Sequence, residues 1–201
     1  MIRIVLASAS PRRRALLRAL GVNFEIAVSD AEERFEGDPA AMVVTNARAK
    51  RDDVAGRLDF PALVIAADTL VFLGNRVLGK PADRDEARAM LAELSGKTHQ
   101  VLTGLSLIET ATGKTAEGYE STDVTFRAFS SDEIDRFVAA VNPIDRAGAY
   151  TVDGPGSLLV ARYSGCYQNV LGFPIVRLDL LLGELGYSLF DLMNAEDCQF
   201  L

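Results

Sequence analysis

The sequence predicts an α/β protein, and three observations predict it. About half of the 201 residues are hydrophobic, enough to bury one substantial core. The chain opens with the pattern of a strand, a tight turn and a helix. Residues 62–67 are apolar on both alternations, as in a central strand covered on both faces. We therefore expect a single α/β domain over residues 1–201, with two lobes that cannot be separated in the sequence.

Composition excludes several classes of protein. A net charge of −7 argues against a general binder of nucleic acid or anionic membranes, because such partners favour a basic face. No apolar run reaches the roughly 18 residues of a membrane span, and the start lacks the pattern of a signal peptide. These features predict a cytoplasmic protein. Cys166 and Cys198 are too far apart to indicate a disulfide framework or a zinc site, so we expect ordinary thiols.

The first helix is well delimited by its own residues. Ser10 suits the N-cap, Pro11 suits the first helical position, and Gly21 suits the left-handed residue past the end. The sequence therefore predicts a helix from Pro11 to about residue 20, directly after the opening strand.

Three arginines, at positions 12–14, occupy the first turn of this helix. Each cation there opposes the helix dipole by roughly 0.3–1 kcal/mol, and a bound anion would remove that cost. Unpaired N–H groups at the helix start, the hydroxyls of Ser8 and Ser10 and the guanidiniums together describe a phosphate cradle. A simple surface arginine cluster explains the same pattern, since the turn matches neither the P-loop nor the dinucleotide-binding glycine motif.

An acidic turn follows a short predicted strand at residues 23–28. This strand is expected to lie beside the first one. Glu32 or Glu33 could then reach the proposed anion site and hold a metal ion. Acidic loops are also commonly just solvated, so both interpretations stay open.

A helix is expected from about residue 39 to residue 58. Val43, Ala47, Lys50 and Val54 recur at the spacing of a buried helical seam, which places Lys50 in an apolar stripe. Its stem could lie on the core while the ammonium reaches water. Alternatively, the charge is directed at a phosphate or a carboxylate.

Asp68 is the strongest single functional candidate. The apolar strand is expected to end at Asp68-Thr69, and ligands of open α/β sheets gather beyond the carboxyl ends of such strands. The alternative is a carboxylate that caps a turn. A predicted hairpin over residues 70–78 then returns the chain to Lys80, which could bring this lysine near Asp68.

The remaining segments are mostly scaffold. His99, the single histidine, is expected to be structural, which argues against catalytic triads and histidine-rich metal sites. The glycine-rich run at residues 146–156 suggests close approach to a ligand, although ordinary turns also contain glycines. The other predicted elements are a helix capped by Asp83 and Glu86, strands at 99–109 and 115–126, a helix capped by Ser130 and Glu133, a strand at 157–163 and a last helix from Pro174 to Gly186.

Together these pieces resemble the Maf family of nucleoside triphosphate pyrophosphatases over about residues 2–185. The resemblance implies an elongated α/β fold, related to the inosine triphosphate pyrophosphatases, with a mixed central sheet and an active-site cleft between two lobes. It also implies a homodimer that hydrolyses a nucleoside triphosphate to a monophosphate and pyrophosphate. The motifs that carry it, in order and spacing, are LASASPRRR at 6–14, Glu32-Glu33, ARAK at 47–50, AADT at 66–69, GKP at 79–81, LSGKTH at 94–99, DVTF at 123–126, AGAY at 147–150 and NVLGFP at 169–174.

The resemblance assigns roles residue by residue. Asp68 matches the family's proton acceptor, and Glu33 matches its acidic partner. Together they would bind Mg²⁺ or Mn²⁺, which takes one or two carboxylates plus substrate phosphates. The residues that match the family's phosphate-side polar set are Ser8, Ser10, Arg13, Lys50 and Lys80.

Three further positions bear on the base. The family branch that hydrolyses thymidine and uridine triphosphates carries Arg, Thr and Gln where this chain has Arg12, Thr69 and Asp153. A glutamine can donate to a pyrimidine carbonyl, whereas an ionised aspartate only accepts. The 7-methylguanosine triphosphate branch carries Trp, Gln and Glu at these positions. We expect a pyrimidine preference, with a 7-methylguanosine or broad preference as the alternative.

A non-catalytic regulator of septum formation and cell division is the competing functional class. The chain keeps Glu33, Lys50, Asp68 and Lys80 together, and a purely binding protein has no need of a carboxylate beside a phosphate cradle. This set favours the enzyme.

Overall fold

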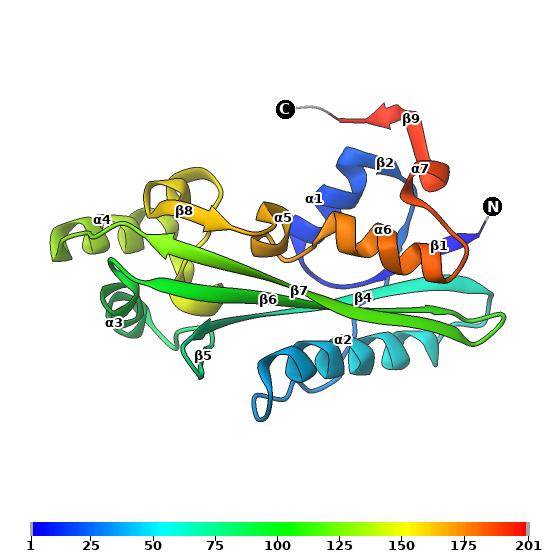
Figure 1. Ribbon diagram of the computed structural model, residues 1–201, viewed down its shortest axis with the longest axis horizontal. Coiled ribbons are helices and arrows are strands. Elements are labelled where there is room, and N and C mark those ends of the chain that lie inside the picture. The colour runs from blue at the N-terminus through cyan, green and yellow to red at the C-terminus, as the bar shows by residue number, and fades with distance from the viewer. Residues whose placement is uncertain (1, 200–201) are drawn as a thin grey trace. The chain divides into compact units, whose positions relative to one another are not determined.

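The computed structural model describes residues 2–199 and confirms an α/β fold with a mixed central sheet flanked by helices (Figure 1). The strand order is β3-β1-β4-β6-β7-β8, with β5 paired to β4. The chain forms two compact units: the first comprises Met1–Thr69, Thr103–Glu120 and Gly172–Leu201, and the second comprises Leu70–Leu102 and Ser121–Leu171. No helix among the described residues has the length and apolar character needed to cross a membrane.

The first unit holds β1, which is parallel to both of its neighbours. Val5 pairs with Glu25 of β3, and Ala7, the last residue of β1, pairs with Ala66 of β4. Strands β2 and β9 form a separate antiparallel pair. The elements that contribute to this unit are β1 (Arg3–Ala7), α1 (Pro11–Ala19), β2 (Leu20–Val22), β3 (Glu25–Ile26), α2 (Pro39–Ala55), β4 (Ala62–Leu73), β6 (Thr98–Glu109), β7 (Lys114–Phe126), α6 (Ile175–Glu184), α7 (Leu189–Leu192) and β9 (Met193–Cys198).

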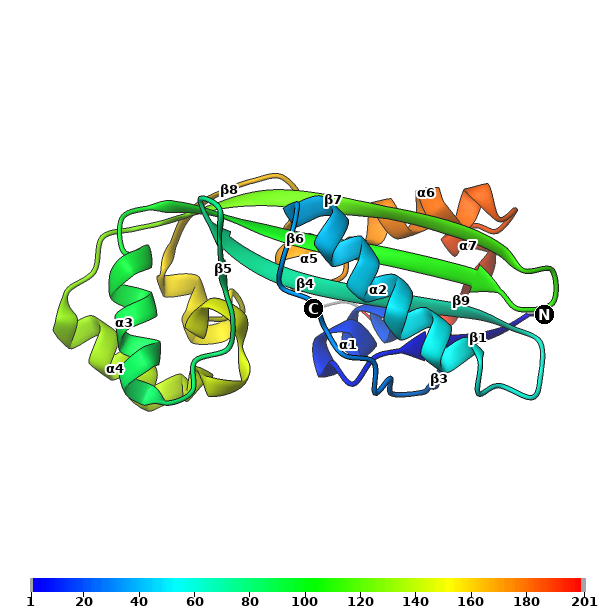
Figure 2. The same cartoon turned by 90° about the horizontal axis from the view of Figure 1, so that it is seen from below.

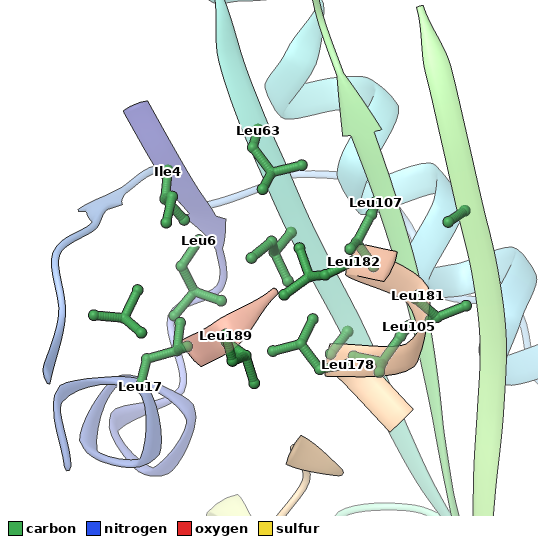
Figure 3. Close-up of a cluster of buried hydrophobic side chains, with 14 of the residues drawn as sticks. Ile4, Leu6, Leu17, Leu63, Leu105, Leu107, Leu178, Leu181, Leu182 and Leu189 are labelled. Carbon is green, nitrogen blue, oxygen red and sulfur yellow. The ribbon is translucent and has the colours of Figure 1, made fainter. Parts of the chain in front are cut away.

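Helices cover both faces of β4 within this unit. Figures 1 and 2 show α2 on one face, with α1 and α6 on the other. Successive side chains of a strand point to opposite faces. Leu63 accordingly belongs to the hydrophobic cluster that includes Leu178 of α6 and Leu17 of α1 (Figure 3), while Val64 and its even-numbered neighbours belong to the cluster that includes Val54 of α2. The same alternation places Asp68 on the α2 face and Thr69 on the α1 face.

The strand that carries Asp68 does not end there, contrary to the expectation. β4 continues to Leu73, because its last residues pair with β5 in the predicted hairpin, Val71 opposite Leu78 and Leu73 opposite Arg76. What ends near Asp68 is the neighbouring strand, since β1 stops at Ala7. Asp68 and Thr69 therefore lie in the middle of β4 but beyond the last residue of β1.

The first unit departs from the predicted boundaries elsewhere too. The strand expected at residues 23–28 is only two residues long, β3, and helix α2 ends at Ala55 rather than near residue 58. The limits of α1 are as predicted: Ser10 is the N-cap, Pro11 begins the helix and Gly21 has a φ of +67°. The short strands β2 and β9 and helix α7 were not predicted.

The second unit has its own core around Phe126, His99 and Tyr150. His99 is 1% exposed, and its Nε2 lies 2.8 Å from the Tyr150 hydroxyl, so the histidine is a core residue. The elements of this unit are the ends of β4, β6 and β7 together with β5 (Arg76–Leu78), α3 (Arg84–Leu94), α4 (Ser131–Val141), β8 (Val160–Ser164), α5 (Tyr167–Val170) and three short 3₁₀ helices at Pro143–Asp145, Ala147–Ala149 and Gly154–Leu158.

Two sequence predictions in this unit need correction. The strand expected at residues 157–163 begins only at Val160, because Gly154–Leu158 form a 3₁₀ helix. Asp83 caps α3 as expected, but the Glu86 carboxylate accepts a hydrogen bond from the Ala82 N–H and so does not complete a capping box. The capping box of Ser130 and Glu133 is present.

Candidate functional site

The Asp68 carboxylate is buried, and both of its oxygens are hydrogen-bonded. The residue is 3% exposed, and each carboxylate oxygen accepts a hydrogen bond from α2. Lys50 Nζ lies 2.6 Å from Oδ1, and Asn46 Nδ2 lies 3.0 Å from Oδ2. Asn46 and Lys50 are four residues apart, which places them on the same face of the helix. One helix face therefore fixes both oxygens of a carboxylate on the neighbouring strand.

Lys50 also joins Asp68 to the acidic turn. Its Nζ is 2.6 Å from Glu33 Oε1 as well as from Asp68 Oδ1, and its side chain is 15% exposed. Of the two interpretations of Lys50, the structure shows the second, in which the charge is directed at carboxylates. The structure thus brings Glu33, Lys50 and Asp68 into direct contact.

Asn46 was missed by the sequence reasoning. It is 1% exposed, and besides Asp68 its amide contacts the backbone of Arg34: Nδ2 donates to the carbonyl at 3.0 Å, and Oδ1 accepts from the N–H at 2.8 Å. The signal was present in the sequence. Position 46 belongs to the same buried seam as Val43, Ala47 and Lys50, and a polar amide on such a seam needs buried partners.

Arg13 is the centre of a second group of contacts, on the α1 face of β4. Its Nη1 donates to Ala67 O at 2.8 Å and to Ser8 Oγ at 3.2 Å, and its Nη2 donates to Thr69 Oγ1 at 3.0 Å. Burial lowers the pKa of the guanidinium, and the nearby Asp68 charge opposes that shift. Four of the five N–H donors are used within the protein, since Nε donates to Gly172 O at 2.8 Å. Arg13 is thereby held in one orientation.

The start of α1 offers donors that the protein does not use. Ser8 Oγ accepts from the Ser10 N–H at 3.1 Å, and Ser10 Oγ accepts from the Arg13 N–H at 3.5 Å. Within residues 2–199 neither hydroxyl donates to a protein acceptor, and Arg12 forms no hydrogen bond or ion pair. These groups can therefore donate to an anion.

The Thr69 hydroxyl contacts two protein side chains. Besides Arg13 it contacts Thr103, with 2.9 Å between the two hydroxyl oxygens. Gly172 is needed for this arrangement. Its φ is +93°, and a Cβ at this position would lie 3.1 Å from Thr69 Oγ1.

Two predicted site residues belong to the second unit. Lys80 lines a surface hollow of about 370 Å³ together with Gly79, Glu86 and Met90. Asp153 accepts a hydrogen bond from the Thr151 hydroxyl. The contacts described above include neither Lys80 nor Asp153.

The paired carboxylates fit a divalent cation. Glu33 and Asp68 already hold one positive group, the Lys50 ammonium, between them, and carboxylate oxygens are the ligands that Mg²⁺ and Mn²⁺ prefer. Among residues 2–199 no group of three or more His, Cys, Asp and Glu side chains is placed to hold a metal ion. A cation at Glu33 and Asp68 would therefore take water or a bound phosphate as its further ligands.

The protein is thus an α/β protein with a pair of carboxylates, Glu33 and Asp68, on the α2 face of β4. Free hydroxyl and guanidinium donors lie at the start of α1. The chain belongs to the Maf-like protein family, whose model matches residues 3–185. A dTTP/UTP pyrophosphatase of Pelotomaculum thermopropionicum is 46% identical over 94% of this chain and 99% of its own length. A dTTP/UTP pyrophosphatase of Alkaliphilus oremlandii is also 46% identical, over 90% and 95%. Among solved structures, the Staphylococcus aureus Ham1 protein is 16% identical, with a TM-score of 0.45 over 62% of this chain and 71% of that chain.

Proposed function

We propose that this protein hydrolyses a nucleoside triphosphate to a nucleoside monophosphate and pyrophosphate. The observation that carries the proposal is the Asp68 carboxylate, which is buried, oriented by two N–H donors and joined through Lys50 to a second carboxylate. The names of the relatives, dTTP/UTP pyrophosphatases at 46% identity over at least 90% of this chain, support the reaction and favour pyrimidine triphosphates.

The residues on the α1 face would hold the substrate phosphates. The hydroxyls of Ser8 and Ser10 are free to donate to phosphate oxygens at the start of α1. Arg13 keeps one free donor and fixes the positions of Ser8 and Thr69. Phosphoryl transfer depends mainly on positioning and charge stabilisation, so a set of fixed donors is the chemistry it needs.

The residues on the α2 face would act on water and on the metal. Glu33 and Asp68 would hold Mg²⁺ or Mn²⁺, which lowers the pKa of bound water and offsets phosphate charge when it is present. Asp68 would accept the proton of the water that attacks the α-phosphorus. Lys50 would leave its bridging position and direct its charge to a substrate phosphate.

The family resemblance alone supports the roles of Lys80 and Asp153. We propose that Lys80 contacts a phosphate and that Arg12, Thr69 and Asp153 select the base. Because Asp153 cannot donate as glutamine does, a broad or 7-methylguanosine preference is the alternative to dTTP and UTP.

We also propose a cytoplasmic homodimer that takes free nucleotides and not nucleic acid. The net charge of −7 supports the latter part, since a polyanion would be repelled. Light scattering coupled to size-exclusion chromatography would measure the oligomeric state.

The test is a panel of nucleoside triphosphates, including dTTP, UTP and 7-methyl-GTP, assayed with Mg²⁺, with Mn²⁺ and with EDTA. We expect pyrophosphate release that EDTA abolishes. The Asp68→Asn variant should lose most activity, while Asp59→Asn, at an exposed position, should match the parent. Release of orthophosphate would mean attack at the γ-phosphorus and would overturn the proposed reaction. No turnover of any nucleotide would favour the non-catalytic class.

A further inference from the structure

Helix α2 holds the acidic turn and Asp68 at two levels, one turn apart. At the first level, the Lys50 ammonium binds the Glu33 and Asp68 carboxylates. At the second level, the Asn46 amide binds the Arg34 backbone, directly after Glu33, and the other oxygen of Asp68. Both levels therefore connect the same two segments to the same helix face.

The two levels respond differently to an incoming ligand. Lys50 carries a charge, so a divalent cation competes with it for the two carboxylates, and a phosphate attracts it away from them. The Asn46 amide is neutral and 1% exposed, and it makes three hydrogen bonds, two of them to the main chain. Because this amide carries no net charge, neither a cation nor a phosphate displaces it. The contact through Asn46 would thus persist when the Lys50 contact is released.

From this geometry we propose that Asn46 is the positioning residue that keeps Glu33 aligned with Asp68 while Lys50 is displaced by metal and substrate. The inference rests on the proposed function in its assignment of the two carboxylates as cation ligands. Partners that orient metal ligands typically contribute 10–100-fold to metal affinity or activity. If the role of Asn46 were purely structural, its hydrogen bonds would only satisfy the buried amide. They would then have no effect on the positions of the Glu33 and Asp68 carboxylates.

The experiment compares the parent with Asn46→Leu, which keeps the branching and the number of side-chain heavy atoms but removes all three hydrogen bonds. The first readout is the exchange rate of the Arg34 amide hydrogen, followed by NMR, because this N–H donates to Asn46 Oδ1. The second is Mn²⁺ binding without nucleotide, followed by electron paramagnetic resonance. The third is the separation of kcat from KM for the preferred triphosphate.

We expect Asn46→Leu to exchange the Arg34 amide faster, to bind Mn²⁺ roughly 10–100-fold more weakly and to lose a similar factor in kcat, with KM changed by less than about 3-fold. The matched control, Asn23→Asp at an exposed position, should leave all three at parent values. A variant that loses thermal stability but keeps the parent Mn²⁺ affinity and kcat would show that Asn46 only fills the core, and the proposal would fail.

A second variant covers the case in which Asn46→Leu does not fold. Asn46→Asp is nearly isosteric and keeps the acceptor for the Arg34 N–H, but in its ionised form it cannot donate to Asp68 or to the Arg34 carbonyl. We expect the Arg34 amide to stay protected while kcat falls at least 10-fold. Full kcat in Asn46→Asp would contradict the inference. A parent that releases no pyrophosphate would refute the proposed function, whereas the exchange and Mn²⁺ measurements would still decide the role of Asn46.

Discussion

At the scale of single residues, the site depends on how each charge is compensated. Asp68 could be singled out from the sequence because a carboxylate inside an apolar strand needs partners, and the seam spacing of α2 pointed to Lys50. The sequence did not show that these two residues are each other's partners, because helix packing on the sheet sets which helix position faces which strand position. Asn46 was overlooked for the same reason, since its partners are two segments distant in sequence.

Removing the Lys50 ammonium should leave two carboxylates close together, one of them buried. Breaking a buried ion pair by deleting one partner costs about 3–5 kcal/mol, so Lys50→Met should lower the free energy of unfolding by an amount in this range, measured by urea denaturation. The double variant with Asp68→Asn should recover most of it. Lys114→Met, at an exposed position, is the control. A stability of Lys50→Met within about 0.5 kcal/mol of the parent would mean that the ion pair is not a buried one in solution.

His99 should make stability depend on pH. Burial lowers its pKa to about 4 from the ordinary 6.5, so the unfolded chain binds an extra proton between these values. Stability from the neutral histidine is therefore complete above pH 6.5 and is lost as the pH falls towards 4, by up to roughly 3 kcal/mol. His99→Phe, which keeps an aromatic ring beside Phe126, should remove this part of the difference in unfolding free energy between pH 7 and pH 5. Since the chain has a single histidine, an unchanged difference would contradict the assignment.

At the scale of elements, local signals predicted α1 closely and the ends of β4 poorly. Caps and turn residues act within a few positions, so Ser10, Pro11 and Gly21 were sufficient for α1. The continuation of β4 beyond Asp68 depends on pairing with β5, and β3 is limited to the two residues that pair with Val5 and Leu6 of β1. Such pairings join separate strands of the folded chain, so the alternation of apolar residues within one segment does not predict them.

The close approach of α2 to the sheet depends on Gly104 of β6. A Cβ at this position would lie 2.3 Å from the backbone of Val43, so Gly104→Ala must push α2 outward and with it Asn46 and Lys50. Overpacking of this kind costs typically about 1–3 kcal/mol, and we expect pyrophosphate release to fall together with stability. Gly183→Ala on α6, where a Cβ meets no atom within 4 Å, should be neutral or stabilising by about 0.5–1 kcal/mol. Equal effects of the two substitutions would argue against a backbone contact at Gly104.

At the scale of the whole molecule, the α/β class and the family followed from the sequence, whereas the grouping of the site residues did not. Composition and a two-sided apolar strand were enough for the class, and ordered motifs over residues 3–185 were enough for the family. In the structure, the site residues of the first unit form one set on the α2 face of β4 and another on the α1 face. This division follows because successive side chains of a strand point to opposite faces. Lys80 and Asp153 belong to the second compact unit, and the roles proposed for them rest on the family resemblance.

Binding of the proposed substrate should stabilise the whole folded chain, because the unfolded chain cannot assemble donors from such distant segments. A ligand at 100 times its Kd adds about 2.7 kcal/mol, which raises Tm by roughly 5–11 °C for a chain of this size. We expect this rise with Mn²⁺ and a UTP analogue that cannot be cleaved between the α- and β-phosphates, and a much smaller one when EDTA removes the metal. Orthophosphate at equal concentration is the control, since it lacks the base and the chain of phosphates.

If Asp153 weakens pyrimidine selection, Asp153→Gln should enlarge the shift with the UTP analogue relative to the 7-methyl-GTP analogue. An unchanged ratio of the two shifts would remove Asp153 from the base-selecting set and leave Arg12 and Thr69 to account for any preference.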